Sequence, residues 1–187
     1  MSIGQFSQRI EMFVLIGIAM FIGSAERLVA TVILPSLPPG SQYQLIFATS
    51  QVTDATSSSL STYNAFVTNS AMPLTAMLPA GVTWHAVGST GATPNDAKDN
   101  APSFAGIPIY NTQGIEVSPG NIYSGSGLLS PILYDENGTL VTQSSGTDLI
   151  WTGADALGND SSNPLSSATP EFGMVGVMTT NWITGSN

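Results

Sequence analysis

The chain begins with polar residues and then stays apolar without a break from Met12 to Gly23. This run matches the length of a signal-peptide core and is shorter than the ~20 residues that a membrane-spanning helix needs. Small residues offer two cleavage points, after Ala25 and after Ala30. The pattern therefore predicts a signal peptide over residues 1–30, with a buried helix or a retained membrane anchor as the alternatives.

Short apolar runs separated by polar loops fill the rest of the chain. Residues 31–42 are rich in Pro and Gly and are predicted to be a lead-in loop to a single globular domain over 43–187. One main helix is predicted over 58–72, ending before Pro73, because Leu60, Tyr63, Val67 and Ala71 recur at helical spacing. Short strands are predicted over 43–49, 82–87, 107–110, 115–117, 132–134, 139–141 and 149–152.

Two pairs of these strands flank turn sequences and are predicted to be hairpins. Residues 111–114 join the first pair and residues 135–138 join the second. The Asn137-Gly138 dipeptide is the strongest hairpin signal in the chain, because both residues tolerate positive φ. The neighbouring Asp135-Glu136 pair is expected at a solvated tip, with a bound cation as the alternative. One early helix, short strands, hairpins and long loops together indicate an α+β fold.

Composition narrows the classes of partner. Only 8% of the residues are charged, the formal net charge is −9, and Lys98 is the only basic residue after Arg27. Nucleic acid is excluded as a partner, because phosphate binding needs clustered basic side chains. The chain has no cysteine, which excludes disulfides, thiolate metal sites and a cysteine nucleophile.

Few residues suggest chemistry. The only histidine, His85, lies in a predicted strand and is expected to have no special role. The cluster from Asn95 to Asn100 offers Asp96 and Asp99 as possible Ca²⁺ ligands, with Asn100 as a further ligand contact. The alternative is a short helix start that Asp96 caps.

Tryptophans and paired acids provide the remaining candidates. The three tryptophans, Trp84, Trp151 and Trp182, are interpreted mainly as core anchors; Trp151 is also a candidate sugar contact. Asp96 paired with Asp99 or with Glu116 would be the acids of a secreted hydrolase.

Several segments in a fixed order resemble a known group. They are Tyr43–Ser50 (YQLIFATS), Asp54–Val67, Trp84–Ser89 (WHAVGS), Asp96–Asn100, Ile107–Val117 (IPIYNTQGIEV) and Val141–Gly153. This order resembles exported bacterial proteins of the type that carries a PEP-CTERM sorting tail, and the endostatin domain of collagens. The resemblance implies a C-type lectin-like fold. The printed sequence ends at Asn187 without the sorting tail, so surface anchoring is not implied.

Departures from the family limit what carries over. The acidic stretch common in the bacterial relatives is replaced here by Asn121–Ser126, and the basic heparin-binding residues of endostatin are missing. The expected function is a non-enzymatic protein, secreted or at the cell surface, which binds exopolysaccharide or other surface proteins. No membrane span is expected in the mature form. A homo-oligomeric subunit of a surface layer or filament and a carboxylate-dependent hydrolase are the alternatives.

Overall fold

A computed structural model describes residues 11–17, 31–91, 95–141 and 149–185, with the backbone alone described in the first of these ranges. The fold is mixed α+β with short strands and few helices, as expected. The elements, in chain order, are β1 (Glu11–Gly17), β2 (Gln44–Ala48), α1 (Leu60–Ser70), α2 (Met72–Thr75), β3 (Thr83–Ala86), α3 (Ala97–Asn100), β4 (Ile109–Asn111), β5 (Glu116–Ser118), β6 (Leu149–Trp151), β7 (Phe172–Met174) and the 3₁₀-helix η1 (Thr180–Trp182).

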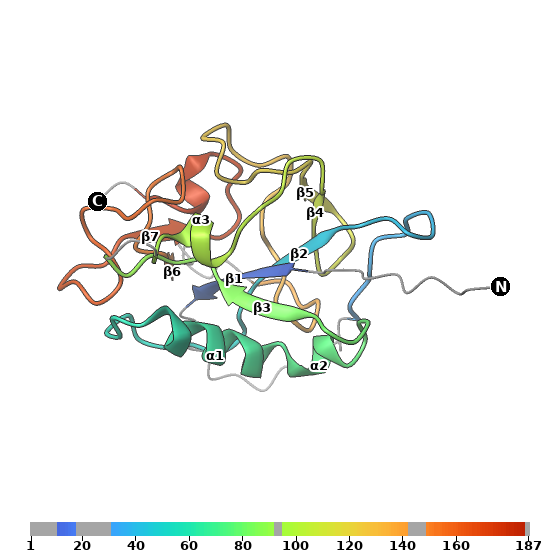
Figure 1. The fold of residues 1–187 in the computed structure, drawn as a ribbon, viewed down its shortest axis with the longest axis horizontal. Coiled ribbons are helices and arrows are strands. Elements are labelled where there is room, and N and C mark those ends of the chain that lie inside the picture. The colour runs from blue at the N-terminus through green and yellow to red at the C-terminus, as the bar shows by residue number, and fades with distance from the viewer. Residues whose placement is uncertain (1–10, 18–30, 92–94, 142–148, 186–187) are drawn as a thin grey trace.

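One sheet runs through the middle of the molecule in the order β5-β4-β2-β1-β6-β7 (Figure 1). Strands β2 and β3 both run parallel to β1, and β4 runs parallel to β2. One side of β1 pairs with β2, whereas the other side is shared between β3 at its beginning and β6 at its end. The strands at the two ends of the order, β5 and β7, are three residues long.

The two faces of the sheet are covered differently. Helices α1 and α2 lie along one face, while α3, η1 and the long loops lie on the other (Figure 1). Strand β2 shows the division: Leu45 and Phe47 pack in the cluster that contains the helices, and Ile46 and Ala48 pack in the opposite cluster. A strand buried on both faces carries a continuous apolar run rather than an alternating one.

The main helix follows its predicted spacing. Leu60, Tyr63 and Val67 are buried in α1, and Ala71 is buried just beyond its end. Pro73 does not stop the helical region, because α2 begins at Met72 and carries the proline in its first turn. A proline there loses no hydrogen bond, since the first N–H groups of a helix have no partner within it.

Strand β1 covers part of the apolar run that predicts a signal peptide. At residues 11–17 the structure has a strand, not the buried helix that was the alternative. The rest of the run and both cleavage points lie outside the described residues. Among the residues that are described, no helix is long and apolar enough to cross a membrane. Removal of residues 1–25 or 1–30 stays a prediction.

Three hairpin turns share one design that sequence inspection missed. Each starts with Asp or Asn, has glycine three residues later, and directs the first side chain onto two backbone N–H groups. Asp135 Oδ1 accepts from the N–H groups of Asn137 and Thr139, both at 2.8 Å. Asn111 and Asp155 do the same in the segments 111–115 and 155–159, at 2.9–3.1 Å.

Glycine completes each of these turns with a positive φ: +68° at Gly114, +76° at Gly138 and +72° at Gly158. The hairpin predicted at Asn137-Gly138 is confirmed by an antiparallel bridge between Tyr134 and Leu140. Its positive φ falls on the glycine, and Ser166 is the only non-glycine residue with positive φ in the described part. Each turn is thus a three-residue hairpin loop whose last residue is a glycine in the left-handed conformation.

Candidate functional site

The predicted Asp96–Asn100 cluster forms the start of the short helix α3, which is held by segments distant in sequence. The N–H of Ala97 donates to Ser89 Oγ at 2.9 Å, and the N–H of Lys98 donates to the carbonyl of Gly158 at 3.0 Å. Tyr123 donates its hydroxyl to the carbonyls of Ala97 and Ala101, the latter at 2.9 Å. Three neighbouring segments therefore satisfy the ends of a helix that is only four residues long.

Asp96 is the centre of this cluster and occupies the N-cap position of the predicted short helix, but its side chain does not cap α3. Its carboxylate makes no hydrogen bond to the first turn, and Oδ1 instead accepts from the N–H of Asp160 at 3.0 Å. Oδ2 lies 3.9 Å from Lys98 Nζ. Because Asp96 is only 9% exposed, this carboxylate fastens the loop around residue 160 to the helix.

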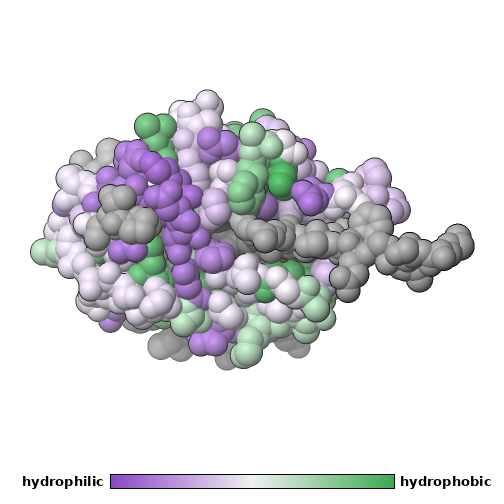
Figure 2. Space-filling model, in the orientation of Figure 1, coloured by the Kyte–Doolittle hydropathy of each residue, from purple (hydrophilic) through white to green (hydrophobic). Residues whose placement is uncertain are grey.

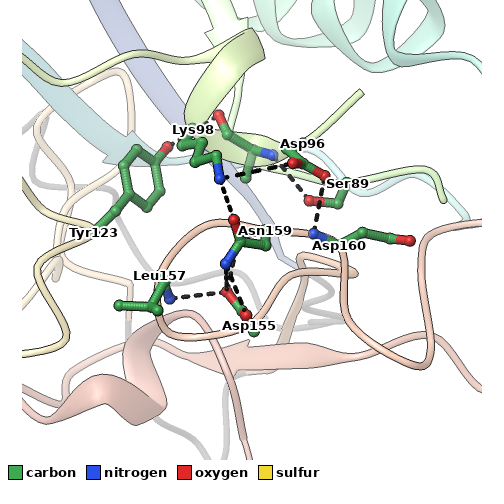
Figure 3. Close-up of polar contacts among 9 residues, drawn as sticks. Ser89, Asp96, Lys98, Tyr123, Asp155, Leu157, Asn159 and Asp160 are labelled. Atoms are coloured by element: carbon green, nitrogen blue, oxygen red, sulfur yellow. Dashed lines mark hydrogen bonds and ion pairs between the residues drawn. The ribbon is translucent and has the colours of Figure 1, made fainter. Parts of the chain in front are cut away.

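The loop of residues 155–160 faces α3 (Figure 3). Asn159 links the two: its Oδ1 accepts a hydrogen bond from Lys98 Nζ, and its Nδ2 donates to Asp155 Oδ2 at 3.1 Å. Figure 3 shows the result as a continuous chain of polar contacts from Asp155 through Asn159 and Lys98 to Asp96. Asp160 follows in the loop, and its carboxylate points away from that chain.

The carboxyl group of Asp160 lies in an environment that disfavours its charged form. Burial raises the pKa of its carboxyl above the ordinary value, and the negative charges of Asp96 and Asp155 raise it further. A hydrogen bond from the Gly91 N–H partly offsets these effects. Its Oδ1 is buried and has no hydrogen-bond partner among the described residues.

We expect Asp160→Asn to stabilise the protein at neutral pH and to have little effect at low pH. A raised pKa in the folded state means that this carboxyl favours folding only while protonated, and the benefit is lost as the pH rises through the folded-state pKa. Removing the charge should gain at most about 1 kcal/mol, because the group is partly exposed. Urea unfolding at pH 3.5 and pH 7.5 measures this difference; equal effects at both pH values would contradict the assignment.

The other candidate residues lie apart from this polar chain. Asp99 is exposed on α3. Asn100 is half-buried, and its Nδ2 donates to the carbonyl of Ala86 at 2.7 Å and to Asn64 Oδ1 at 2.9 Å. Asn64 in turn donates to Asn100 Oδ1 at 2.8 Å and accepts from the Ala86 N–H at 2.8 Å. The amide of Asn100 is therefore engaged in closing the outer edge of β3.

The tryptophans serve mainly as core residues. Trp84 and Trp182 are 3% and 1% exposed, which confirms their interpretation as core anchors. Trp151 is half-buried in β6 and packs against the helix-side cluster. It does not lie in the polar contact chain around Asp96, so the structure does not join Trp151 and Asp96 into one site.

The acid pairs expected for a hydrolase are not the pairs that interact. Asp96 contacts Asp160 and Lys98. Glu116 lies in β5, level with Tyr110 of β4. Burial is the main cause that raises the pKa of the Tyr110 phenol, and the negative charge of Glu116 raises it further. His85 is half-buried in β3, and its Nδ1 has no hydrogen-bond partner among the described residues. Within the described part of the chain, no three acidic or histidine side chains form a group that could hold a metal ion.

The expectation of a solvated tip at Asp135-Glu136 is wrong. Asp135 is 7% exposed and Glu136 only 3%, because the turn packs against the segment after β2. Glu136 accepts hydrogen bonds from the backbone N–H of Ser50 at 2.8 Å and from the Ser50 hydroxyl.

A pocket of about 250 Å³ opens beside this turn; its lining includes Leu74, Met77 and Asn137. Hydrophobic side chains gather over α2 on the same side (Figure 2).

No protein family, curated protein or solved structure matches this chain. The site therefore has to be interpreted from its own geometry.

Three residues of the polar arrangement around α3 were missed at the sequence level: Asp155, Asn159 and Asp160. Asp155 carried a usable signal, since Asp155 and Gly158 have the same spacing as Asp135 and Gly138. Asp160 carried none, because its partner Asp96 lies 64 positions away.

Proposed function

We propose that this chain is a non-enzymatic extracellular binding or matrix protein whose ligand is a neutral polysaccharide. The observation that carries the proposal is that several acidic and amide side chains fix the conformations of turns and loops. Asp135, Asp155 and Asn111 each fix a hairpin turn, and Asp96 fastens one loop to α3. These groups hold long polar loops in set conformations.

Loops with a fixed conformation favour binding, because a loop that is already ordered loses little conformational entropy when a ligand binds. Hydroxyl and amide side chains offer both donors and acceptors, as a polyhydroxyl ligand requires. Hydrophilic residues form a band across one face of the molecule, near α3 (Figure 2). This band is the surface on which we expect the ligand to lie.

The charge distribution selects neutral over acidic polysaccharides. The sequence has a formal net charge of −9, and Lys98, the only basic residue after Arg27, is engaged with Asp96 and Asn159. An acidic polysaccharide would meet repulsion, and the part of the chain that the structure describes holds no Lys or Arg other than Lys98 to offset it. We further propose that residues 1–30 are an export signal, which places the protein outside the cell, and that the α+β fold has a C-type lectin-like arrangement, which suits loop-based binding.

Co-sedimentation with polysaccharides tests this function. We expect the full chain to bind a neutral glucan and not a polyuronate, and to bind equally at about 0.05 M and 0.5 M NaCl, since charge attraction is not involved. Parallel samples with Ca²⁺ and with a chelator show whether glucan binding depends on a cation held by Asp96 and Asp99. Failure to bind any neutral polysaccharide would remove the proposed ligand class.

A pair of charge-matched variants locates the surface. Asp99→Asn alters an exposed residue of α3, and we expect it to weaken glucan binding by about threefold or more. Glu116→Gln makes the same change of charge in β5 and should leave binding unaltered. Equal effects of the two variants would show that net charge, and not the α3 face, decides binding.

A further inference from the structure

Strand β1 lies in a slot between β2 and β3. Met12 is level with Leu45 on one side and with Trp84 on the other, and Val14 is level with Phe47 and Ala86. Because neighbouring strands lie about 4.8 Å apart, the strands on either side of β1 are about 9.6 Å apart. At that separation β2 and β3 cannot hydrogen-bond to each other.

The edge of β3 that faces the slot is the edge at which its backbone needs hydrogen bonds from another strand. On the opposite side, the amides of Asn64 and Asn100 already bind the N–H and carbonyl of Ala86. Backbone groups of successive strand residues point to alternate sides, so those of His85 point into the slot. In the described residues β3 pairs with β1 and no other strand.

The walls of the slot are mainly apolar. On the helix side they carry Leu45, Phe47, Trp84 and Ala86. On the loop side they carry Ile46 and Ala48 from β2 and, by alternation along β3, the half-buried His85. An occupant is therefore buried on both faces and must be apolar at successive positions, not at alternate ones. The segment Glu11–Gly17 meets this requirement, since it is apolar from Met12 onward.

The proposed export would disconnect this strand, because both predicted cleavage points follow Gly17. We propose that the slot is a strand-accepting site: in the processed protein it binds an extended apolar segment of a second protein chain, which runs parallel to β2 and β3 in the place of Glu11–Gly17. This inference rests on the export part of the proposed function. An empty slot would leave backbone donors and acceptors unpaired and two apolar clusters open to water.

A full chain with a specific protease site inserted after Ala25 tests the proposal. The protein is purified intact, cut, unfolded in urea and refolded with a fluorescent peptide of the sequence Glu11–Gly17 extended by lysines for solubility. We expect the peptide to co-elute with the cut protein and to raise its unfolding temperature. The uncut chain, whose slot is filled, should take up about tenfold less peptide.

A peptide with Val14→Pro is the matched control, because proline in a central strand cannot donate to the ladder. It should bind about tenfold more weakly than the original. Cut protein that refolds with an unchanged unfolding temperature, without its N-terminal fragment and without taking up peptide, would overturn the proposal. Equal binding of the two peptides would also overturn it, since it would show adhesion and not strand pairing.

The same samples separate this inference from the ligand assignment. Peptide uptake by a protein that binds no glucan would leave the strand-accepting slot standing and remove the polysaccharide. Glucan binding by cut protein that ignores the peptide would have the opposite meaning.

Discussion

Gly153→Ala should lower the free energy of unfolding by about 3 kcal/mol or more, which corresponds to roughly 6–12 °C in melting temperature. Gly153 has φ +60°, where a side chain is strained. A β-carbon there would lie 2.3 Å from the backbone N of Leu165 and 2.4 Å from the carbonyl oxygen of Ser89. Those two atoms form a 2.8 Å hydrogen bond, so the added methyl group would push apart the segments that support α3.

Gly106→Ala is the control for this substitution. Gly106 also has positive φ, +78°, but nothing lies within 4 Å of an added β-carbon. It should therefore show only the conformational cost, about 1–2 kcal/mol. Thermal unfolding of both variants separates strain from collision; equal losses would mean that the contact between Gly153 and the Ser89–Leu165 pair is not tight.

Trp182→Ala should destabilise the protein by about 3–5 kcal/mol, the range for deleting a large buried aromatic side chain. Trp182 is 1% exposed, and its ring centroid lies 6.4 Å from that of Tyr123. Since Tyr123 donates to carbonyls at both ends of α3, the cavity should also loosen that helix. Urea unfolding gives the stability, and amide hydrogen exchange over residues 97–100 reports on α3.

Leu157→Ala provides the comparison for the tryptophan, because Leu157 is 51% exposed in the loop that faces α3. A change within about 0.5 kcal/mol is expected there. Faster exchange in α3 for Trp182→Ala, but not for Leu157→Ala, would identify the Tyr123 contact as the connection. Unchanged exchange in both would show that α3 is held by Ser89 and the 155–160 loop alone.

Local patterns predicted most of the elements correctly, because they depend on neighbouring residues. The helical spacing from Leu60 to Val67 and the alternation around Trp84 both correspond to observed elements. Pro73 was interpreted as a helix stop, although the first turn of a second helix accepts proline equally well. The repeated Asp/Asn-to-Gly spacing is visible in the sequence, and comparison of the three segments would have revealed the shared turn.

Long-range contacts explain what sequence inspection could not supply. A solvated Glu136 is the natural expectation for a hairpin tip, and only the fold brings Ser50 to it. The residue type of Asp96 favoured a helix cap, but its carboxylate accepts from the N–H of Asp160, which lies 64 positions away in sequence. The run from Met12 to Gly17 is compatible with both an export signal and a central parallel strand, because each requires unbroken apolar sequence.

The two outermost strands limit how copies of this chain can associate. β5 and β7 each offer only three residues, and β5 includes the charged Glu116. Margins this short, one of them charged, are poor templates for lateral growth of a sheet from one molecule into the next, which is how many β-rich proteins aggregate. With β1 in place, a filament or layer built from this protein would therefore need side-chain surfaces for its contacts, and the uncut chain should resist amyloid-like stacking at high concentration.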